Sequence, residues 1–411
     1  MSGKGTGSTM ALSGIRILDF GQIAMVPIGT SYLADFGAEV IKVESFANLD
    51  PGRRGDTMAV DAHPDPDRNL LFARYNQNKL GVLINLKKPK GVALAKKLIS
   101  ISDVVIENFT VDVMPRLGLG YEELRKVKPD IIMLSASFGG QTGPYRDFRA
   151  QGFVLAALQG IDDLTGWPDR GPVSPASAFG DHYIPFMYVV QIIAALEYRS
   201  RTGKGQFIDG SSFEGCLDAL DTALTDYSVN GRVLSRRGNR HSLAAPHGVY
   251  QCQGEQRWCT IAVFNDAEWQ SFCNVLGNPG WTSQAKFSTL LGRLENVDEL
   301  DQLVQEWTRS QQAEDVALKL QQAGIAAEVV KNIKDLHEDA QLTYRNHYWE
   351  PEEPGLEAFT FESPSARLSK TPARFQRRYP LLGEHNDYVF RELLGLDLQE
   401  YNRLIEEEVI H

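Results

Sequence analysis

The sequence predicts an α/β protein with a Rossmann-like parallel sheet, because short apolar segments alternate with helical segments up to residue 136. Residues 15–20 (IRILDF) and 39–43 (EVIKV) have the length and composition of buried strands. Residues 27–36, which begin with Pro and stop before Gly37, are typical of a helix. No GxGxxG motif follows the first segment, so the layout does not indicate NAD.

The same alternation continues along the chain. Strands are expected at residues 81–85, 103–106 and 131–136, and helices at 89–100 and 121–127. A long helix is then expected at 182–201, and its apolar residues occupy nearly every face, which is typical of a buried helix. A strand at 206–208 and a helix at 212–227 follow it.

The character of the chain changes near residue 230, where arginines and glycines cluster in a linker. Beyond it we expect a small α+β domain at 230–335, with strands at 248–252, 258–263 and 324–330 and helices at 267–276 and 297–323. Residues 350–372 are expected to be extended, and helices close the chain from about residue 386. Residues 1–11 are mostly small and polar, and they are expected to form a flexible leader.

Composition excludes several classes of protein. The chain has 411 residues and a formal net charge of −11, which argues against a general nucleic-acid binder. No apolar run reaches the ~18 residues of a membrane span. Its four cysteines form no CxxC pair, so neither a disulfide framework nor a metal site is expected. Scattered free thiols are typical of a reducing compartment, so a cytoplasmic location is expected.

Asp181 is the first candidate for chemistry, since it lies between the small-residue run 174–180 and the long apolar helix. An Asp before a helix is a common N-cap, and on residue preferences alone that interpretation is favoured. The functional alternative is that the positive end of the helix keeps a partly buried carboxylate ionised. Such a carboxylate can attack an activated acyl group.

Two further sets of residues follow expected strands. Residues 135–145 (SASFGGQTGPY) place paired glycines after a strand, where the backbone can approach an anion, although a plain turn explains them equally well. Cationic and aromatic groups at strand ends suit a phosphate-rich ligand with an adenine ring, although exposed lysines are usually solvated: Lys79, Lys87, Lys88, Phe109 and Arg116. His241 and His247 are best interpreted as loop hydrogen-bonders, and no GxSxG, HExxH or P-loop motif is present.

Together these segments resemble the family III CoA-transferases, the group of formyl-CoA and carnitine CoA-transferases. The resemblance covers nearly the whole chain. It is carried by LSGIRILDFGQIAMVP, LADFGAEVIKVE, NQNKLGVLINLKKPKG, DVVIENF, PRLGLGYEEL, SASFGGQTGPY, the Gly180–Asp181 pair, AALEYRSRTGKGQFIDGSSFEG, LQQAGIAAEVV and PLLGEHND.

The resemblance implies an interlocked dimer. It also implies a large CoA-binding domain formed by both chain ends, 12–229 and 336–411, with the small domain inserted between them. Asp181 then becomes the covalent nucleophile, which passes through a mixed anhydride and an aspartyl-CoA thioester. By resemblance, coenzyme A, bound as an acyl-CoA substrate without a metal, lies along Ala24, Asn85, Leu86, Lys87, Asn108, Phe109, Arg116, Ser137, Phe138, Gly139 and Gly140.

Departures from the family pattern bear on the substrate. Ala24 replaces a glutamine of formyl-CoA transferase, and residues 238–248 (GNRHSLAAPHG) replace a glycine-rich lid. Formyl-CoA and oxalate are therefore not expected as substrates. The segment resembles transferases of larger acids, such as succinyl-CoA:benzylsuccinate CoA-transferase, and some of these relatives pair two homologous subunits.

Two alternatives remain open. A racemase or isomerase of acyl-CoA on the same fold needs a His base opposite an Asp. The matching stretch here is Ala150–Gln151–Gly152, which lacks a histidine and disfavours that reaction, although His182 lies beside Asp181. The chain could also be a CoA-binding partner subunit of a heteromeric transferase, which the presence of Asp181 argues against.

Overall fold

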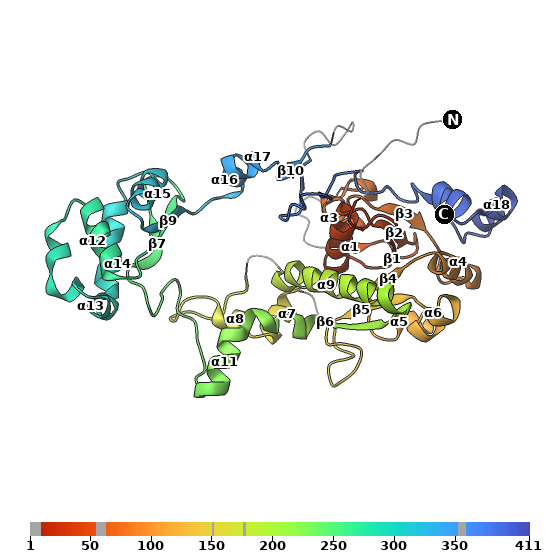
Figure 1. Ribbon diagram of the computed structural model, residues 1–411, viewed down its shortest axis with the longest axis horizontal. Helices are drawn as coiled ribbons and strands as arrows, with labels where there is room; N and C mark the ends of the chain where they lie inside the picture. Colours follow the sequence, from red (N-terminus) through yellow and green to blue (C-terminus); the bar gives the residue numbers. More distant parts are fainter. Residues whose placement is uncertain (1–9, 55–62, 150–151, 176–177, 352–358) are drawn as a thin grey trace. The chain divides into compact units, whose positions relative to one another are not determined.

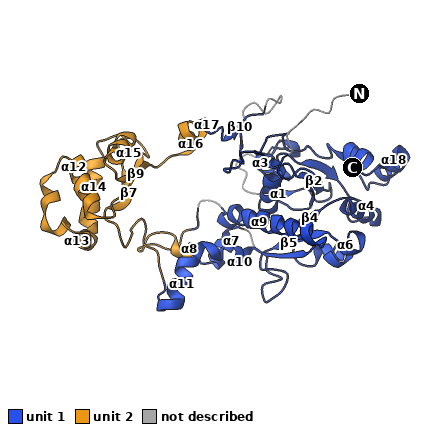
Figure 2. Cartoon of the chain, in the orientation of Figure 1, with its two compact units in different colours: residues 1–161, 174–233, 344–411 blue, residues 162–173, 234–343 orange. Residues whose placement is uncertain are grey.

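The computed structural model describes residues 10–54, 63–149, 152–175, 178–351 and 359–411. These form two compact units (Figures 1 and 2). Unit 1 comprises 1–161, 174–233 and 344–411, and unit 2 comprises 162–173 and 234–343. Residues 1–9 of the expected leader and 352–358 of the expected extended segment lie outside the described residues.

Unit 1 is built on a six-stranded sheet in which every pair of neighbours is parallel. The strand order β3-β2-β1-β4-β5-β6 is that of a doubly wound dinucleotide-binding fold, so the predicted α/β architecture is confirmed. Its strands are β1 (Arg16–Asp19), β2 (Glu39–Glu44), β3 (Leu80–Leu83), β4 (Val104–Glu107), β5 (Ile132–Ser137) and β6 (Phe207–Ser211).

Helices cover both faces of this sheet, because successive strand residues point to opposite sides. Ile17 and Val104 face α1 (Met25–Asp35) and α9 (Phe179–Thr202), whereas their neighbours Leu18 and Val105 face the other layer. That second layer consists of α4 (Pro89–Ser100), α6 (Tyr121–Val127), a π-helix at Asp387–Leu393 and α18 (Leu398–Glu406).

Shorter elements connect these layers. They are α2 (Pro51–Arg54), a 3-10 turn at Pro66–Arg68, α3 (Leu70–Tyr75), α5 (Val113–Arg116), α7 (Gly152–Leu158), α10 (Ser212–Gly215), a 3-10 turn at Leu217–Leu220, α11 (Asp221–Asn230), β10 (Tyr348–Trp349) and β11 (Phe361–Glu362). The short helix α8 (Ile161–Leu164) lies at the boundary, and all but its first residue belong to unit 2. The single helix expected at 212–227 is thus three short pieces.

The end of the chain packs against the β3 edge of the sheet. Ile410 forms an antiparallel bridge with Ile84, and the Asn85 amide donates to the Val409 carbonyl at 2.9 Å. The side-chain oxygen of Asn386 accepts from the Leu83 amide, also at 2.9 Å. Residues 83–85 at this edge are therefore hydrogen-bonded to residues more than 300 positions later in the sequence.

The helix α9 is not wholly buried, contrary to the interpretation of its all-round apolar pattern. Ile184, Tyr188 and Ile192 pack in the core, but Phe186 and Val190 are 46% and 63% exposed on the opposite face. Cover on that face is only partial: the Phe186 ring packs edge to face against Tyr32 of α1, with the centroids 5.3 Å apart. By length and composition alone α9 could also cross a bilayer, but the core helix of a soluble protein meets the same criterion.

Unit 2 is a small α+β unit with an antiparallel sheet in the order β7-β8-β9. Its elements are β7 (His247–Gln251), β8 (Trp258–Ala262), α12 (Asp266–Val275), 3-10 turns at Gly280–Ser283 and Ala285–Phe287, α13 (Leu290–Glu295), α14 (Val297–Thr308), α15 (Ala313–Gln322), β9 (Ala326–Val329) and α16 (Ile333–His337), with α17 (Ala340–Tyr344) at its boundary. The expectation of a single helix at 297–323 is wrong, because this segment forms the two helices α14 and α15. It breaks at 309–312, where Gln253 donates its amide to the Gln311 carbonyl at 2.8 Å.

Asp35, at the end of α1, ties three distant segments of unit 1 together. Its carboxylate accepts from the side-chain amides of Gln77 at 3.2 Å and Asn78 at 2.7 Å, and its carbonyl accepts from the Arg374 amide at 2.9 Å. The Asn78 side chain also donates to the Arg374 carbonyl. This junction holds the returning segment against the first helix.

The junction should make the stability of unit 1 depend on pH. Burial raises the pKa of Asp35 to about 7, against the opposing amide hydrogen bonds. A carboxyl with a raised pKa stabilises the fold while protonated, so this contribution is lost as the pH rises through 7. Between about pH 5.5 and about pH 8.5, wild type should lose ~2 kcal/mol more unfolding free energy than Asp35→Asn. Denaturant unfolding measures both, and equal losses would contradict the assignment.

Candidate active site

The strand order of unit 1 reverses between β1 and β4, and ligands bind in open α/β sheets at such a point. A cavity of about 310 Å³ opens there, at the carboxyl ends of β1, β4 and β5. Its lining is mainly apolar and comes from the β1–α1 loop, the residues after β4 and β5, α7 and the start of α9. The position follows directly from the topology.

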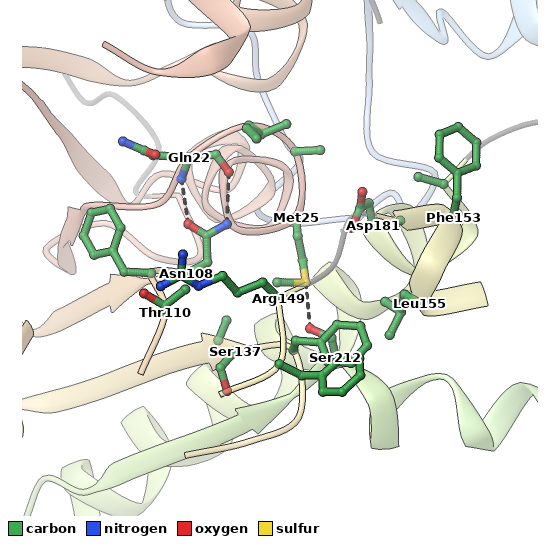
Figure 3. A pocket seen from close by; sticks show the side chains of 18 of the residues that line it. Gln22, Met25, Asn108, Thr110, Ser137, Arg149, Phe153, Leu155, Asp181 and Ser212 are labelled. Carbon is green, nitrogen blue, oxygen red and sulfur yellow. Dashed lines mark hydrogen bonds between the residues drawn. The ribbon is translucent and has the colours of Figure 1, made fainter. Parts of the chain in front are cut away.

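Asp181 lies in this lining, and its side chain projects into the cavity from the start of α9 (Figure 3). It is the third residue of the helix, whose N-cap is Ala178, so the interpretation of Asp181 as the N-cap is wrong. Its carboxylate accepts a hydrogen bond from none of the described residues. Burial raises its pKa, and the nearby His182 opposes the shift. Burial thus outweighs the effect of His182, and the net shift of the Asp181 pKa is upward.

His182 and Tyr75 form a polar pair beside the nucleophile candidate. The Nδ1 of His182 lies 3.2 Å from the Ala178 carbonyl, and its Nε2 lies 3.2 Å from the Tyr75 hydroxyl. Because a carbonyl only accepts, a neutral His182 carries its proton on Nδ1, and Nε2 accepts from the hydroxyl. Both rings line the cavity, so they present a fixed polar edge next to Asp181.

The β1–α1 loop forms the facing wall. The Gln22 amide donates to Oδ1 of Asn108 at 2.8 Å, and Nδ2 of Asn108 donates back to the Gln22 carbonyl at 3.0 Å (Figure 3). Further along, the Ser212 hydroxyl lies 3.2 Å from the sulfur of Met25. The reciprocal pair fixes Asn108 and the loop as one surface.

Two arginines supply positive charge to the lining. Arg146 is paired with Asp112 at 2.6 Å. Arg149 pairs with no acidic group in the described part of the chain, and its side chain extends along the cavity toward Thr110 (Figure 3). The cavity therefore offers one uncommitted cation to an anionic ligand.

The cavity brings together six of the residues named from the sequence. These are Ala24, Asn108, Phe109, Ser137, Phe138 and Asp181. The other six do not line it: Asn85, Leu86, Lys87, Arg116, Gly139 and Gly140. Gly139 instead packs closely on Tyr145, and Asn85 donates its side chain to the Glu408 carbonyl.

Lys79 is not available to a ligand, contrary to its interpretation as an exposed strand-end cation. It is fully buried and pairs with Asp19 at 3.0 Å. Sequence reasoning in turn missed Tyr75, Arg146 and Arg149, which reach the cavity from α3 and from the loop after β5. Nothing in their local sequence indicates that these segments meet Asp181. Ala150 and Gln151 lie outside the described residues.

The family profile named CoA-transferase family III matches residues 12–386. The chain belongs to this family. It is 32% identical over 97% of its length to the succinyl-CoA–D-citramalate CoA-transferase of Chloroflexus aurantiacus, covering 98% of that protein. It is 33% identical over its full length to the alpha subunit of succinyl-CoA–L-malate CoA-transferase of the same organism, covering 95% of it.

Among solved structures, a CaiB/BaiF family protein of Brucella suis superposes with a TM-score of 0.86 at 29% identity, over 94% of this chain and all of that one. Family membership makes the chain a CoA-transferase, an enzyme whose substrates are CoA thioesters and acids. The resemblance read from its motifs is thereby confirmed.

Gly152, the first residue of α7, packs directly on the start of α9. A Cβ at this position would lie 2.9 Å from Oδ2 of Asp181 and closer still to the Ala178 side chain. Gly152→Ala should therefore displace the carboxylate and lower kcat by about tenfold or more, since small misplacements at a reacting centre are costly. Gly171→Ala in unit 2, where a Cβ meets open space, is the matched control. Equal steady-state rates in the two variants would contradict the prediction.

Proposed function

We propose that this chain transfers CoA through a covalent intermediate on Asp181. The observation that carries the proposal is the position of this carboxylate, which faces an apolar cavity at the reversal of strand order and accepts no hydrogen bond from the described residues. A carboxylate without such donors keeps its electron density available for attack on a carbonyl carbon. The apolar lining limits water, which would hydrolyse an anhydride.

The proposed reaction has four balanced steps. Asp181 attacks the carbonyl carbon of the donor thioester, and the C–S bond breaks to give a mixed anhydride and the CoA thiolate. The thiolate attacks the Asp181 carbonyl carbon, which forms aspartyl-CoA and releases the donor carboxylate. The acceptor carboxylate then attacks aspartyl-CoA to give a second anhydride and the thiolate. Attack of this thiolate on the acceptor carbon releases the new acyl-CoA and regenerates Asp181.

Racemisation on the same fold is less well supported. That reaction needs a base and an acid on opposite sides of the α-carbon. Asp181 and His182 are consecutive residues of one helix turn, and the stretch 150–152 contains no histidine. His182 is also engaged with Tyr75 and the Ala178 carbonyl. Its place favours a role in holding the substrate.

We further propose succinyl-CoA as the donor and a 2-substituted succinate as the acceptor. The two Chloroflexus relatives are named for malate and citramalate, which are succinates with a 2-hydroxyl group and, in citramalate, also a 2-methyl group. In this chain the cavity near Asp181 carries Leu71, Phe148 and Phe153, which suit an apolar substituent such as the benzyl group of benzylsuccinate. Arg149 offers a charge to the second carboxylate.

The proposed partner is a second family III subunit. It is either another copy of this chain, in an interlocked homodimer, or a homologous chain. Phe186, Val190 and Ile193 on α9 are exposed, and so are Phe153 and Val154 on the contacting helix α7. An apolar face of this kind is typical of a protein interface. The relative named an alpha subunit makes a heteromer a specific alternative.

Replacing Asp181 tests the covalent route. Asp181→Asn should abolish transfer, with a loss of about a thousandfold or more, because an amide cannot form the anhydride. Intact-protein mass spectrometry should find the added mass of CoA on wild type incubated with acyl-CoA and none on the variant. Peptide mapping should locate the added mass on the peptide that contains residue 181. Hydroxylamine should inactivate wild type only when acyl-CoA is present. A folded variant with wild-type turnover would exclude this mechanism.

An acceptor screen tests the substrate class. With succinyl-CoA as donor, 2-benzylsuccinate should give about tenfold higher kcat/KM than malate, as expected when one apolar group is buried. Arg149→Ala should raise KM for the dicarboxylates more than for a monocarboxylate such as 3-phenylpropanoate. Faster turnover of malate than of benzylsuccinate would refute the apolar-substituent proposal while leaving the covalent route intact.

A further inference from the structure

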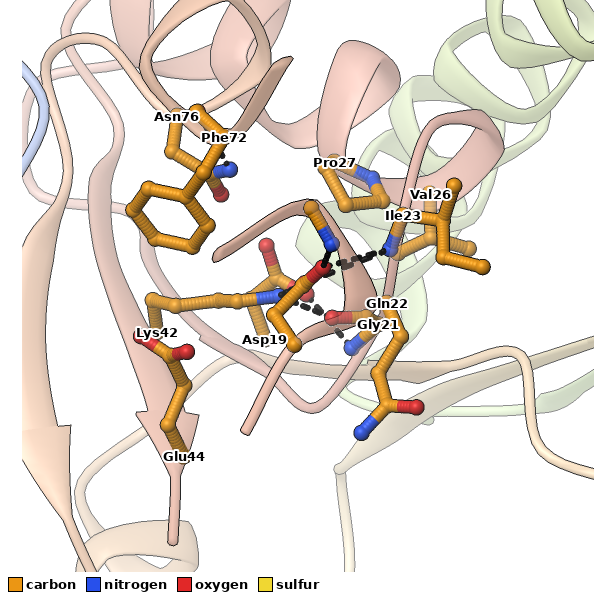
Figure 4. A network of polar contacts seen from close by, with 12 residues as sticks. Asp19, Gly21, Gln22, Ile23, Val26, Pro27, Lys42, Glu44, Phe72 and Asn76 are labelled. Atoms are coloured by element: carbon orange, nitrogen blue, oxygen red, sulfur yellow. Dashed lines mark hydrogen bonds and ion pairs between the residues drawn. The ribbon is translucent and has the colours of Figure 1, made fainter. Parts of the chain in front are cut away.

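Four charged side chains next to the β1–α1 loop are buried, and two of them, Asp19 and Lys42, are labelled in Figure 4. Asp19, Lys42 and Lys79 are 0% exposed and Asp50 is 1% exposed. Lys79 pairs with Asp19, and Lys42 pairs with Asp50, each at 3.0 Å. We call these four residues the buried quartet. Two carboxylates and two ammonium groups leave it without net charge.

Stability alone does not account for the buried quartet. A buried ion pair costs desolvation that its attraction only partly offsets, and apolar residues of similar volume often stabilise a fold as well or better. Burial raises the pKa of Asp19, but the two lysines and the Thr30 hydroxyl outweigh this effect, and the net shift is downward. The net shift of the Lys42 pKa is upward, because Asp50 and Asp19 outweigh burial, whereas burial lowers the pKa of Lys79 to about 8. Asp19 and Lys42 are therefore held in their charged forms, which suggests a task beyond packing.

That task is visible in what the buried quartet binds besides itself. Each member also holds a backbone atom of the loop between β1 and the first turn of α1. Asp19 accepts from the Gly21 amide at 2.7 Å, Lys42 donates to the Gly21 carbonyl, Asp50 accepts from the Ile23 amide at 3.1 and 3.2 Å, and Lys79 donates to the Pro27 carbonyl at 3.0 Å.

The loop needs such support because it is strained. Ile23 has φ of +64°, in the left-handed region that a β-branched side chain rarely adopts. A conformation of this kind costs ~1–3 kcal/mol and persists only where its surroundings determine it. The next residue, Ala24, lines the cavity, and the backbone of the preceding residue, Gln22, forms two hydrogen bonds with the Asn108 side chain. A change in the Ile23 backbone would therefore move this wall of the cavity.

We propose that the buried quartet positions the β1–α1 loop for CoA transfer, with Asp50 and Lys42 as positioning residues that hold Ile23 in its strained conformation. None of the four lines the cavity, so they act only through the loop. The inference rests on the proposed function for the identity of the cavity as the acyl site. Arg53 provides a contrast: it is equally buried and pairs with Glu44 and Asp67, but its side chain forms no hydrogen bond with described residues of the segment 21–27.

A double-mutant cycle on residues 23 and 50 tests this role. Asp50→Asn removes the charge opposite Lys42 and one acceptor for the Ile23 amide, and should lower kcat/KM by about tenfold. Glycine adopts the left-handed conformation without a Cβ penalty. In an Ile23→Gly background the same Asp50→Asn change should therefore cost only about twofold, which is a strong coupling. A purely structural Asp50 would cost the same in both backgrounds.

Hydrogen exchange on the full-length protein provides a second measurement. In Asp50→Asn the peptide covering residues 20–28 should exchange faster, while β4 and β5 keep their protection. The matched control is Arg199→Met, which breaks a pair with Asp103 at 2.8 Å at the opposite ends of the strands. It should lower stability but leave kcat/KM unchanged. If Asp50→Asn does not fold, Asp50→Glu replaces it, because the longer side chain keeps the charge and shifts the acceptor.

The outcomes separate this inference from the covalent mechanism. Faster exchange of the loop with unchanged kcat/KM, or equal costs in the two backgrounds, would overturn the positioning role even where aspartyl-CoA still forms. A failure of the Asp181 prediction would instead remove the mechanism, while the exchange result would still report on the loop. Coupling together with local exchange supports the proposal.

Discussion

Everything in unit 1 depends on the reversal of strand order between β1 and β4. All six strands end at the same edge of the sheet, and the connections leaving β1 and β4 turn to opposite faces. At that point no helix crosses the edge, so a hollow remains between two loops. The chain fills the walls of this hollow with apolar side chains and brings the start of its longest helix to it. The Asp181 carboxylate is thereby taken out of bulk water without a hydrogen-bond donor among the described residues.

The strands and the alternation of layers were predictable from the sequence, because a buried parallel strand is apolar on both faces and short. The fate of charged residues was not. Lys79 looks like a solvated lysine at a strand end, and only the three-dimensional placement of Asp19 shows that it is buried and paired. Tyr75 and Arg149 reach the site from segments whose local pattern says nothing about the cavity. Such residues are defined by contacts across the fold.

The errors at helices have a common cause, which is that periodicity reports which side chains are apolar and not what covers them. The all-round apolar pattern of α9 predicted full burial, yet one of its faces is largely exposed within the described chain. Likewise, the continuous helical pattern over 297–323 hid a break at 309–312, where the Gln311 carbonyl accepts a hydrogen bond from the backbone amide of Gln253. The sequence correctly placed Asp181 near a helix start. In the structure, however, it is the third residue of the helix and not the residue before it, because Ala178 is the N-cap, without a side-chain hydrogen bond.

The pairing of the last residues with the β3 edge has a consequence for biosynthesis. Residues 80–85 leave the ribosome long before residues 386–410, and all of unit 2 is translated in the interval. During that time the nascent chain carries an unpaired sheet edge and an uncovered apolar face, which are the features that chaperones bind and that drive aggregation. Translation therefore has to finish before the first domain can close, and chain truncation late in the gene should be as damaging as a lesion near its start.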